Sequence, residues 1–164
     1  MYESGKYCAL DVAEYVLKYC HEKGIKVTHL QLQKILYFLN GEWIRKKSDF
    51  LIDDDFYAWQ MGPVIRKVYN HYAVNGGLSI NPDNEYQYEH ELSDEDKTEL
   101  NPFIEKYAKM TAWVLVDMSH QTDPWINTTE LFGNKSRISK NSIRKYFSGN
   151  LFDKLSREYN SGGS

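Results

Sequence analysis

The stretch from Thr28 to Arg45 constrains the fold of this chain more strongly than any other. Its first residues, Thr28-His-Leu-Gln31, match the capping box, in which a threonine hydroxyl and a glutamine side chain satisfy free amides at the start of a helix. The residues that follow are apolar on almost every side of a helix, with a main stripe of Leu32, Ile35, Leu36, Leu39 and Trp43. Such a helix is stable only when other elements surround it. The sequence therefore predicts a central helix over residues 28–45.

Three polar residues, Gln33, Lys34 and Asn40, interrupt the apolar surface of this helix. A polar group that is buried without a partner costs about 1–3 kcal/mol. We therefore expect each of the three side chains either to find a hydrogen-bond partner or to reach the surface.

Apolar residues at helical spacing predict further helices around the central one. We expect helices over residues 10–21, 63–72, 93–107 and 112–120. A last helix begins after Ser139 or Ser142, with Gly149-Asn150 as its weak point, and carries an apolar stripe of Ile143, Phe147, Leu151 and Leu155.

Prolines and turn residues set the other expected boundaries. Pro63 is expected at the first position of its helix, Pro102 to kink or divide the next one, and Asp123-Pro124 to end helical geometry. The short segments 78–80 and 86–88 flank a run of turn residues and predict a small hairpin.

The 164 residues contain neither an internal repeat nor a linker. The predicted fold is mainly α: a single compact helical domain of about five to six helices with a small antiparallel β-hairpin, over residues 1–160. Residues 161–164, Ser-Gly-Gly-Ser, are typical of a flexible tail or of a cloning remnant.

Cysteine usage and hydropathy predict the compartment. Cys8 and Cys20 are too few for a disulfide framework, so we expect two reduced thiols. No signal peptide is evident, and no apolar run reaches the ~20 residues that a membrane span needs. We expect a cytoplasmic protein that does not contact membranes.

Common catalytic and metal-binding patterns do not occur in this sequence. It has no P-loop, dinucleotide fingerprint or hydrolase elbow, and its five histidines lack zinc-ligand spacing. Ser119, His120 and Asp123 are too close in sequence to face one another from a helix. The acidic run Asp53–Asp55 favours a solvated loop over a metal site. We expect no catalytic residues, no metal and no cofactor.

The net charge of -3 hides two oppositely charged segments. Residues 83–99 hold eight acids and one lysine, net -7, and residues 134–160 hold seven bases and two acids, net +5. They are either solvated helix faces or a dipolar surface that steers a charged partner. On the second interpretation the candidate partner-binding residues are Asp83, Glu85, Glu89, Glu91, Asp94 and Glu95, and the candidate basic patch is Lys140, Arg144 and Lys145.

Two tryptophans lie in unusual segments, Ala58-Trp-Gln-Met-Gly-Pro-Val64 and Ser119-His-Gln-Thr-Asp-Pro-Trp125. One interpretation is that Trp59 and Trp125 anchor the core near helix ends. The other is that they share a pocket or binding face with His120.

Together with Thr28–Phe38 and the closing Ile143–Phe147, these two segments resemble the Panacea-domain family, also described as phage-associated or SocA/GepA-like proteins. The ordered set extends from about Leu10 to Phe147. The tyrosine-rich middle, 81–91, does not fit the family pattern. The positions that match the family signature are Gln33, Lys34, Tyr37, Trp59, Gly62, Pro63, His120, Pro124 and Trp125.

The resemblance implies a helical antitoxin from a bacterial or prophage toxin–antitoxin system. It would bind a cognate protein toxin directly, without catalysis, and the toxin would be encoded by an adjacent gene. Alternatives from the sequence are a nucleic-acid-binding regulator that uses the basic C-terminal helix, an enzyme with a site between Trp59 and His120, and a phage-encoded inhibitor of a host defence protein. Association with further copies of the chain stays open.

Overall fold

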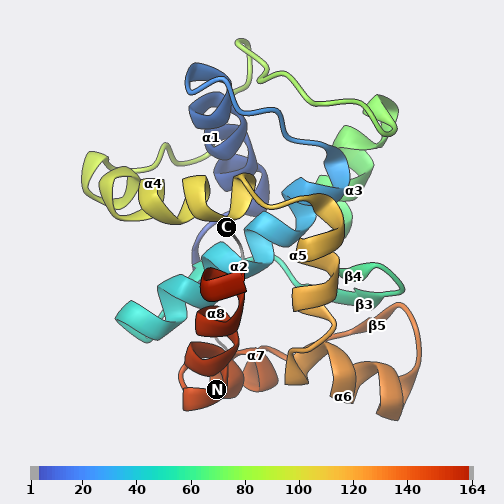
Figure 1. The fold of residues 1–164 in the computed structure, drawn as a ribbon. Coiled ribbons are helices and arrows are strands. Elements are labelled where there is room, and N and C mark those ends of the chain that lie inside the picture. The colour runs from blue at the N-terminus through green and yellow to red at the C-terminus, as the bar shows by residue number, and fades with distance from the viewer. Residues whose placement is uncertain (1–3, 163–164) are drawn as a thin grey trace.

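The computed structural model describes residues 4–162 and is mainly α-helical (Figure 1). Its helices are α1 (Ala9–Glu22), α2 (His29–Lys47), α3 (Arg66–Tyr72), α4 (Asp94–Ala108), α5 (Ala112–Ser119), α6 (Asp123–Phe132), α7 (Lys140–Phe147) and α8 (Asn150–Gly162), with a 3-10 turn η1 (Ala73–Asn75). Its strands are β1 (Gly5–Tyr7), β2 (Phe50–Ile52), β3 (Tyr57–Trp59), β4 (Gly62–Val64) and β5 (Ser136–Arg137). The predicted tail at 161–164 begins inside the last turn of α8, and residues 163–164 lie outside the described part.

Helix α2 is the central element, as the sequence predicts. Every residue from Leu32 to Ile44 is buried, and α1, α3, α4, α5 and α7 all contact the helix (Figure 1). The capping box is present: the Gln31 amide donates to Thr28 Oγ1 at 3.3 Å, and the Thr28 amide donates to Gln31 Oε1 at 2.9 Å. α7 approaches so closely that a Cβ on Gly41 would lie 2.3 Å from a ring carbon of Phe147.

Two small sheets lie against α2. β1 and β2 pair in parallel, and β4, β3 and β5 form a three-stranded antiparallel sheet in that order. Asp53 and Asp54 accept hydrogen bonds from the backbone amides of Gly5 and Ala9, at 2.9 and 2.8 Å. The acidic run after β2 is therefore not only a solvated loop, because two of its carboxylates fix the N-terminal segment.

The hairpin predicted at residues 78–88 is wrong. Ser79 forms an isolated bridge with Thr28, and residues 81–92 cross α1 in irregular conformation (Figure 1). The reason is a competing set of hydrogen bonds. Ile80 donates its amide to Val27, and the Tyr86 hydroxyl and the amides of Glu89 and His90 bind the carboxylate of Asp11 on α1.

The boundaries expected at two prolines are also wrong. Pro63 lies within β4 instead of at the start of a helix, and α3 begins only at Arg66. Asp123-Pro124 begins α6 instead of ending helical geometry, because the missing amide of a proline costs nothing in the first turn. The expectation that Pro102 divides its helix fails as well, since α4 is assigned as one helix through that residue.

The described residues contain eight α-helices, more than the predicted five to six. Besides α6, the difference comes from the last helix, which breaks at Gly149 into α7 and α8. The buried apolar side chains form one cluster, in which the rings of Phe38, Tyr107 and Phe152 stack. Both cysteines are free thiols. No described helix combines the length and the apolar character needed to cross a membrane.

Candidate functional site

Buried polar side chains on α2 bind the backbone of neighbouring elements. Gln33 Oε1 accepts from the amide of Ile65 at 2.9 Å, directly after β4. Asn40 Oδ1 accepts from the amides of Leu51 and Ile52 in β2, at 2.9 and 3.1 Å. Through their oxygens, the two side-chain amides thus hold β2 and the end of β4 against the central helix, whereas Gln33 Nε2 and Asn40 Nδ2 are buried without a hydrogen-bond partner in the described part of the chain.

Lys34 lies between these two amides and is completely buried. Its Nζ donates to the carbonyl oxygen of Pro63 at 3.0 Å, and no carboxylate of the described residues lies within ion-pair distance. Burial lowers the pKa of Lys34 to about 7. The side chain therefore places a weakly compensated cation beneath the turn between β3 and β4.

Gly62 makes this close approach possible. Its φ of +103° is in a region that favours glycine, and an added Cβ would lie 2.6 Å from Lys34 Cε and 2.5 Å from Ser119 Oγ. Glycine at this position, followed by the fixed φ of Pro63, fits the turn to the buried lysine.

Tyr37 connects α2 to the turn between α5 and α6. Its hydroxyl lies 2.9 Å from Thr122 Oγ1, which in turn donates to the carbonyl oxygen of Ser119 at 2.8 Å. Because Thr122 uses its proton in this second bond, Tyr37 is the donor in the first. Burial raises the pKa of Tyr37 well above its usual range, so the phenol stays protonated.

The two tryptophan segments meet at the surface end of this network. Trp125 Nε1 donates to the carbonyl oxygen of Trp59 at 2.8 Å. The His120 ring stacks on Trp125 with centroids 4.1 Å apart, and its Nε2 lies 2.9 Å from the carbonyl oxygen of Gln60. With Pro124 buried at the start of α6, all the signature positions named from the sequence lie in one continuous arrangement around the β3–β4 turn.

This arrangement suits positioning better than catalysis. Ser119 Oγ donates to the carbonyl oxygen of Val116 at 2.8 Å, so it points away from His120. Burial raises the pKa of Cys8 to about 12 and that of Cys20 to about 11, which disfavours the reactive thiolate. Within the network, the side chains of Lys34, Ser119 and His120 each bind a backbone carbonyl oxygen instead of one another.

The model of the Antitoxin SocA-like, Panacea domain family matches residues 32–126, which is more than half of the chain. The chain belongs to this family. Antitoxin SocA of Caulobacter vibrioides is 37% identical over 65 residues, which cover 40% of this chain and 35% of that protein. The match thus spans about a third of the relative's length. No solved structure matches the chain.

The Panacea match contains the whole network around the β3–β4 turn and ends one residue after Trp125. It excludes β5, α7 and α8. All the signature positions therefore lie within the matched region, and elements on both sides of it, among them α1, α7 and α8, complete the buried core.

We define the acidic strap as residues 81–95, which cross α1 and enter the first turn of α4. All six candidate partner-binding acids lie in it and are exposed. Asp11 holds the strap from below: its carboxylate accepts from Tyr86 Oη at 2.8 Å and from the amides of Glu89 and His90 at 3.1 and 2.8 Å. The strap is thus fixed by buried carboxylates and presents its own acids outward.

Glu14 provides a second anchor, one helical turn along α1. Its carboxylate accepts from Tyr72 Oη at 2.6 Å and from the amide of Asp83 at 3.1 Å. Burial, together with the hydrogen bond to a carboxylate, raises the pKa values of both Tyr72 and Tyr86. The sequence analysis did not identify Asp11 and Glu14 as anchors. The pattern that could have indicated them is a pair of acids beside the apolar stripe of the first helix.

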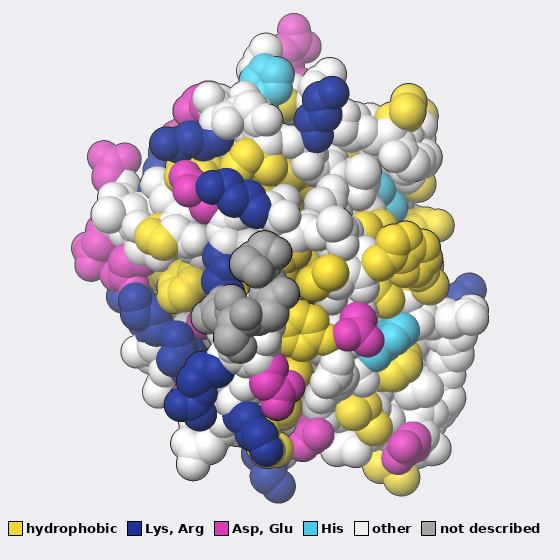
Figure 2. All heavy atoms as spheres, in the orientation of Figure 1, with side chains coloured by type: hydrophobic (Ala, Val, Ile, Leu, Met, Phe, Trp, Pro, Cys, Tyr) yellow, Lys and Arg dark blue, Asp and Glu magenta, His cyan; other side chains and the backbone are white. Residues whose placement is uncertain are grey.

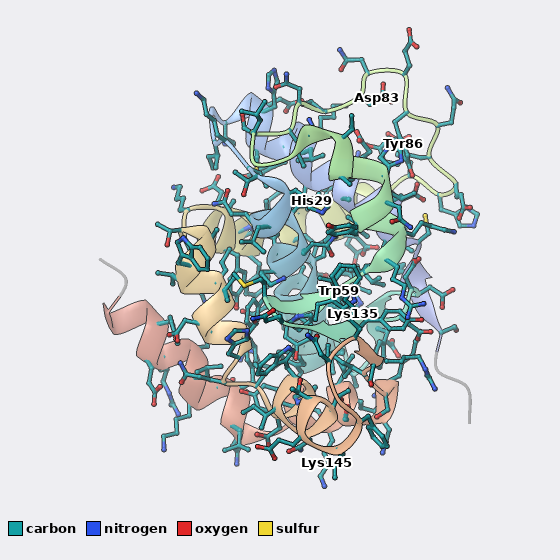
Figure 3. All side chains as sticks on the ribbon, turned by 90° about the vertical axis from the view of Figure 1, so that its right-hand side faces the viewer. His29, Trp59, Asp83, Tyr86, Lys135 and Lys145 are labelled. Atoms are coloured by element: carbon teal, nitrogen blue, oxygen red, sulfur yellow. The ribbon has the colours of Figure 1, made fainter. Side chains whose placement is uncertain are left out.

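The candidate basic patch is only partly free to bind a partner. Lys140 Nζ donates to the carbonyl oxygen of Asp53, and Arg144 donates to that of Ser48, both at 2.6 Å. Lys145 is exposed at the end of the molecule opposite Asp83 and Tyr86 (Figure 3). The structure adds a cation that the sequence did not assign to this region: Arg45 Nη1 donates to Asp153 Oδ1 at 2.9 Å and joins the basic end of α2 to α8. Figure 2 shows a column of Lys and Arg side chains at the lower left of the molecule, where α2 ends in Figure 1.

One set of possible metal ligands was not expected from the sequence. Ligand atoms of Cys8, Asp11 and Glu89 lie within 4.8 Å of one another. Asp11 already accepts three hydrogen bonds, and the raised pKa of Cys8 opposes the thiolate that a metal requires. The chemistry of this set fits an anchor for the strap better than a metal site.

Proposed function

We propose that this protein is an antitoxin that neutralises a cognate protein toxin by direct, non-catalytic binding. The observation that carries the proposal is membership of the SocA-like Panacea family. The buried network supports it, because it stabilises the fold while leaving surface segments free to differ between partners. We further propose that residues 1–160 act as one unit in the cytoplasm and that the toxin is encoded by an adjacent gene.

The acidic strap is the contact surface that we favour. Its acids project from a segment that Asp11 and Glu14 hold in place, so little conformational entropy is lost when a partner binds. The strap itself contains no lysine or arginine, and the nearby Lys97 of α4 reaches Glu91 only at 3.9 Å, which leaves the negative charge largely uncompensated. A basic toxin surface would complement this charge and would gain association rate from it.

A nucleic-acid partner at the basic patch has weaker support. Lys140 and Arg144 donate hydrogen bonds to carbonyl oxygens near β2, which partly compensate their charge. A phosphate backbone requires several free cations in a row, and their binding weakens steeply with salt.

Co-expression with the product of the neighbouring gene tests the function. We expect that product to stop growth when expressed alone and growth to recover when this protein is present. A neighbouring product that is harmless alone, or that stays toxic beside this protein, would refute the antitoxin function.

Two matched variants test the surface. The strap variant carries Glu85→Gln, Glu91→Gln and Asp94→Asn; the control carries Glu22→Gln, Glu130→Gln and Asp49→Asn, which are exposed outside the strap. Both remove the same charge, so we expect only the strap variant to lose neutralisation. Equal neutralisation by both would leave the antitoxin function standing and exclude the strap as the docking surface.

A further inference from the structure

The outer face of the three-stranded sheet gathers aromatic rings and cations from separate parts of the chain. Tyr57 and Trp59 are two residues apart on β3 and share a face, and Arg137 of β5 lies opposite Tyr57 in the register. Arg66 of α3 places its guanidinium 3.6 Å from the centre of the Tyr57 ring. Lys135 places Nζ 5.1 Å from the centre of the Trp59 ring. We call these five residues the cationic sheet face.

Its cations have no acidic partner within the described residues. Arg66, Lys135 and Arg137 are all exposed, and the ion pairs of residues 4–162 involve other bases. Lys135 also has a φ of +70°, an unfavourable conformation for a residue with a side chain. The loop before β5 thus accepts backbone strain, and the result is a cation held over Trp59.

The position of the rings decides which anionic partner fits. Arg66 covers the Tyr57 ring, and the Trp59 ring is contacted by Lys135 and by Tyr69, whose centroid lies 4.8 Å away. Nucleic acid bound to such a platform would stack its bases on free ring faces. Here the protein's own side chains already contact the ring faces. The rings orient the cations, and the outer side of each cation stays available to a carboxylate.

We propose that the cationic sheet face binds an acidic segment of the partner toxin. This inference rests on the proposed antitoxin function and adds a second contact surface, of opposite charge to the acidic strap. Figure 3 shows Trp59 and Lys135 near the centre of the face that also carries Asp83 and Tyr86 at its upper end. One partner can therefore meet both surfaces with complementary charge.

An apolar pair borders the sheet face. Leu131 and Phe132 at the end of α6 expose 74% and 73% of their surface, and the Phe132 carbonyl oxygen accepts from Ser136 Oγ at 2.9 Å. Large apolar side chains beside cations are typical of the centre of protein interfaces. They favour a protein segment that combines acidic with apolar residues.

Charge neutralisation on this face, with a matched control, tests the inference. The sheet variant carries Arg66→Gln, Lys135→Gln and Arg137→Gln. The control carries Lys18→Gln, Lys46→Gln and Lys154→Gln, exposed positions on α1, α2 and α8. Circular dichroism melting checks that both variants fold as the wild type does.

The first measurement is neutralisation of the neighbouring gene product in cells. We expect the wild type and the control to restore growth and the sheet variant to fail. If the wild type itself fails, the proposed function is refuted. If the wild type and the sheet variant neutralise equally well, the antitoxin function stands and the inference about the sheet face is overturned.

The second measurement identifies the chemistry of the ligand. Fluorescent peptides tiled across the neighbouring gene product, and a fluorescent oligouridylate, are titrated against each variant by anisotropy. We expect acidic peptides to bind the sheet variant about tenfold more weakly than the control. Equal binding of acidic peptides to both variants, or a preference for oligouridylate that the sheet variant loses, would overturn the proposal.

Discussion

Replacing Lys34 with methionine removes a buried cation while keeping a long, unbranched side chain. Lys34 is completely buried. Among the described residues, its Nζ donates one hydrogen bond, to the carbonyl oxygen of Pro63. Burial lowers its pKa from 10.5 to about 7. The unfolded chain therefore binds more protons than the folded chain between these two pH values, and stability rises with pH across this window.

These two pKa values give the size of the effect. The free energy of unfolding of the wild type should rise by about 2 kcal/mol between about pH 7 and about pH 9. At about pH 7 the buried lysine costs roughly 4 kcal/mol relative to a neutral side chain, and loss of the donor to Pro63 costs roughly 1–3 kcal/mol. Lys34→Met should therefore be about 1–3 kcal/mol more stable than the wild type at neutral pH. Its free energy of unfolding should not show the rise between about pH 7 and about pH 9.

Urea denaturation followed by circular dichroism measures both quantities. Cys8 and Cys20, with raised pKa values of about 12 and 11, and the buried tyrosines are common to both proteins, so the difference between them isolates Lys34. Lys67→Met, at an exposed position on α3, is the control and should follow the wild type. A rise of the same size in Lys34→Met and in the wild type would refute the reasoning.

Three further substitutions test the network and the central helix by urea denaturation. Gly62→Ala should lower the free energy of unfolding by more than about 2 kcal/mol, because of its φ of +103° and a Cβ contact of 2.5 Å; Gly77→Ala, with open space around it, should be near neutral. Asn40→Ala should cost about 2–4 kcal/mol, since two backbone amides of β2 lose their acceptor; an effect under about 0.5 kcal/mol would contradict the network. Thr28→Ala should cost about 1 kcal/mol through loss of the cap, and no change would show that the box contributes nothing.

Local patterns predicted the elements whose stability is mostly local. The capping box at Thr28 and the caps of α4 and α5 at Ser93 and Thr111 are all present. The central position of α2 followed from its apolar surface alone. The family resemblance, carried by short motifs in the correct order, is confirmed by the family match over residues 32–126.

Expectations failed where distant groups compete for the same backbone. The segment after Ser79 has the composition of a hairpin, yet Ile80 donates its amide to Val27, and Asp11 accepts from the amides of Glu89 and His90 just after the expected second strand. Pro63 has the character of a helix start, yet the side-chain oxygen of Gln33 accepts from the amide of Ile65, two residues later, where the backbone is still extended. Periodicity does not report such contacts, because both partners lie far apart in sequence.

The sequence by itself determined a mainly helical fold around residues 28–45, the family, and the separation of charge along the chain. Each depends on the order of residues within short windows, where spacing and composition carry the information. Only the tertiary structure decided which charges are available to a partner. It fixed the acidic strap on Asp11 and Glu14, turned Lys140 and Arg144 toward backbone carbonyls, and assembled the cationic sheet face from three separate segments. Burial and hydrogen bonding between distant residues determine that outcome, and neither is a property of any one segment.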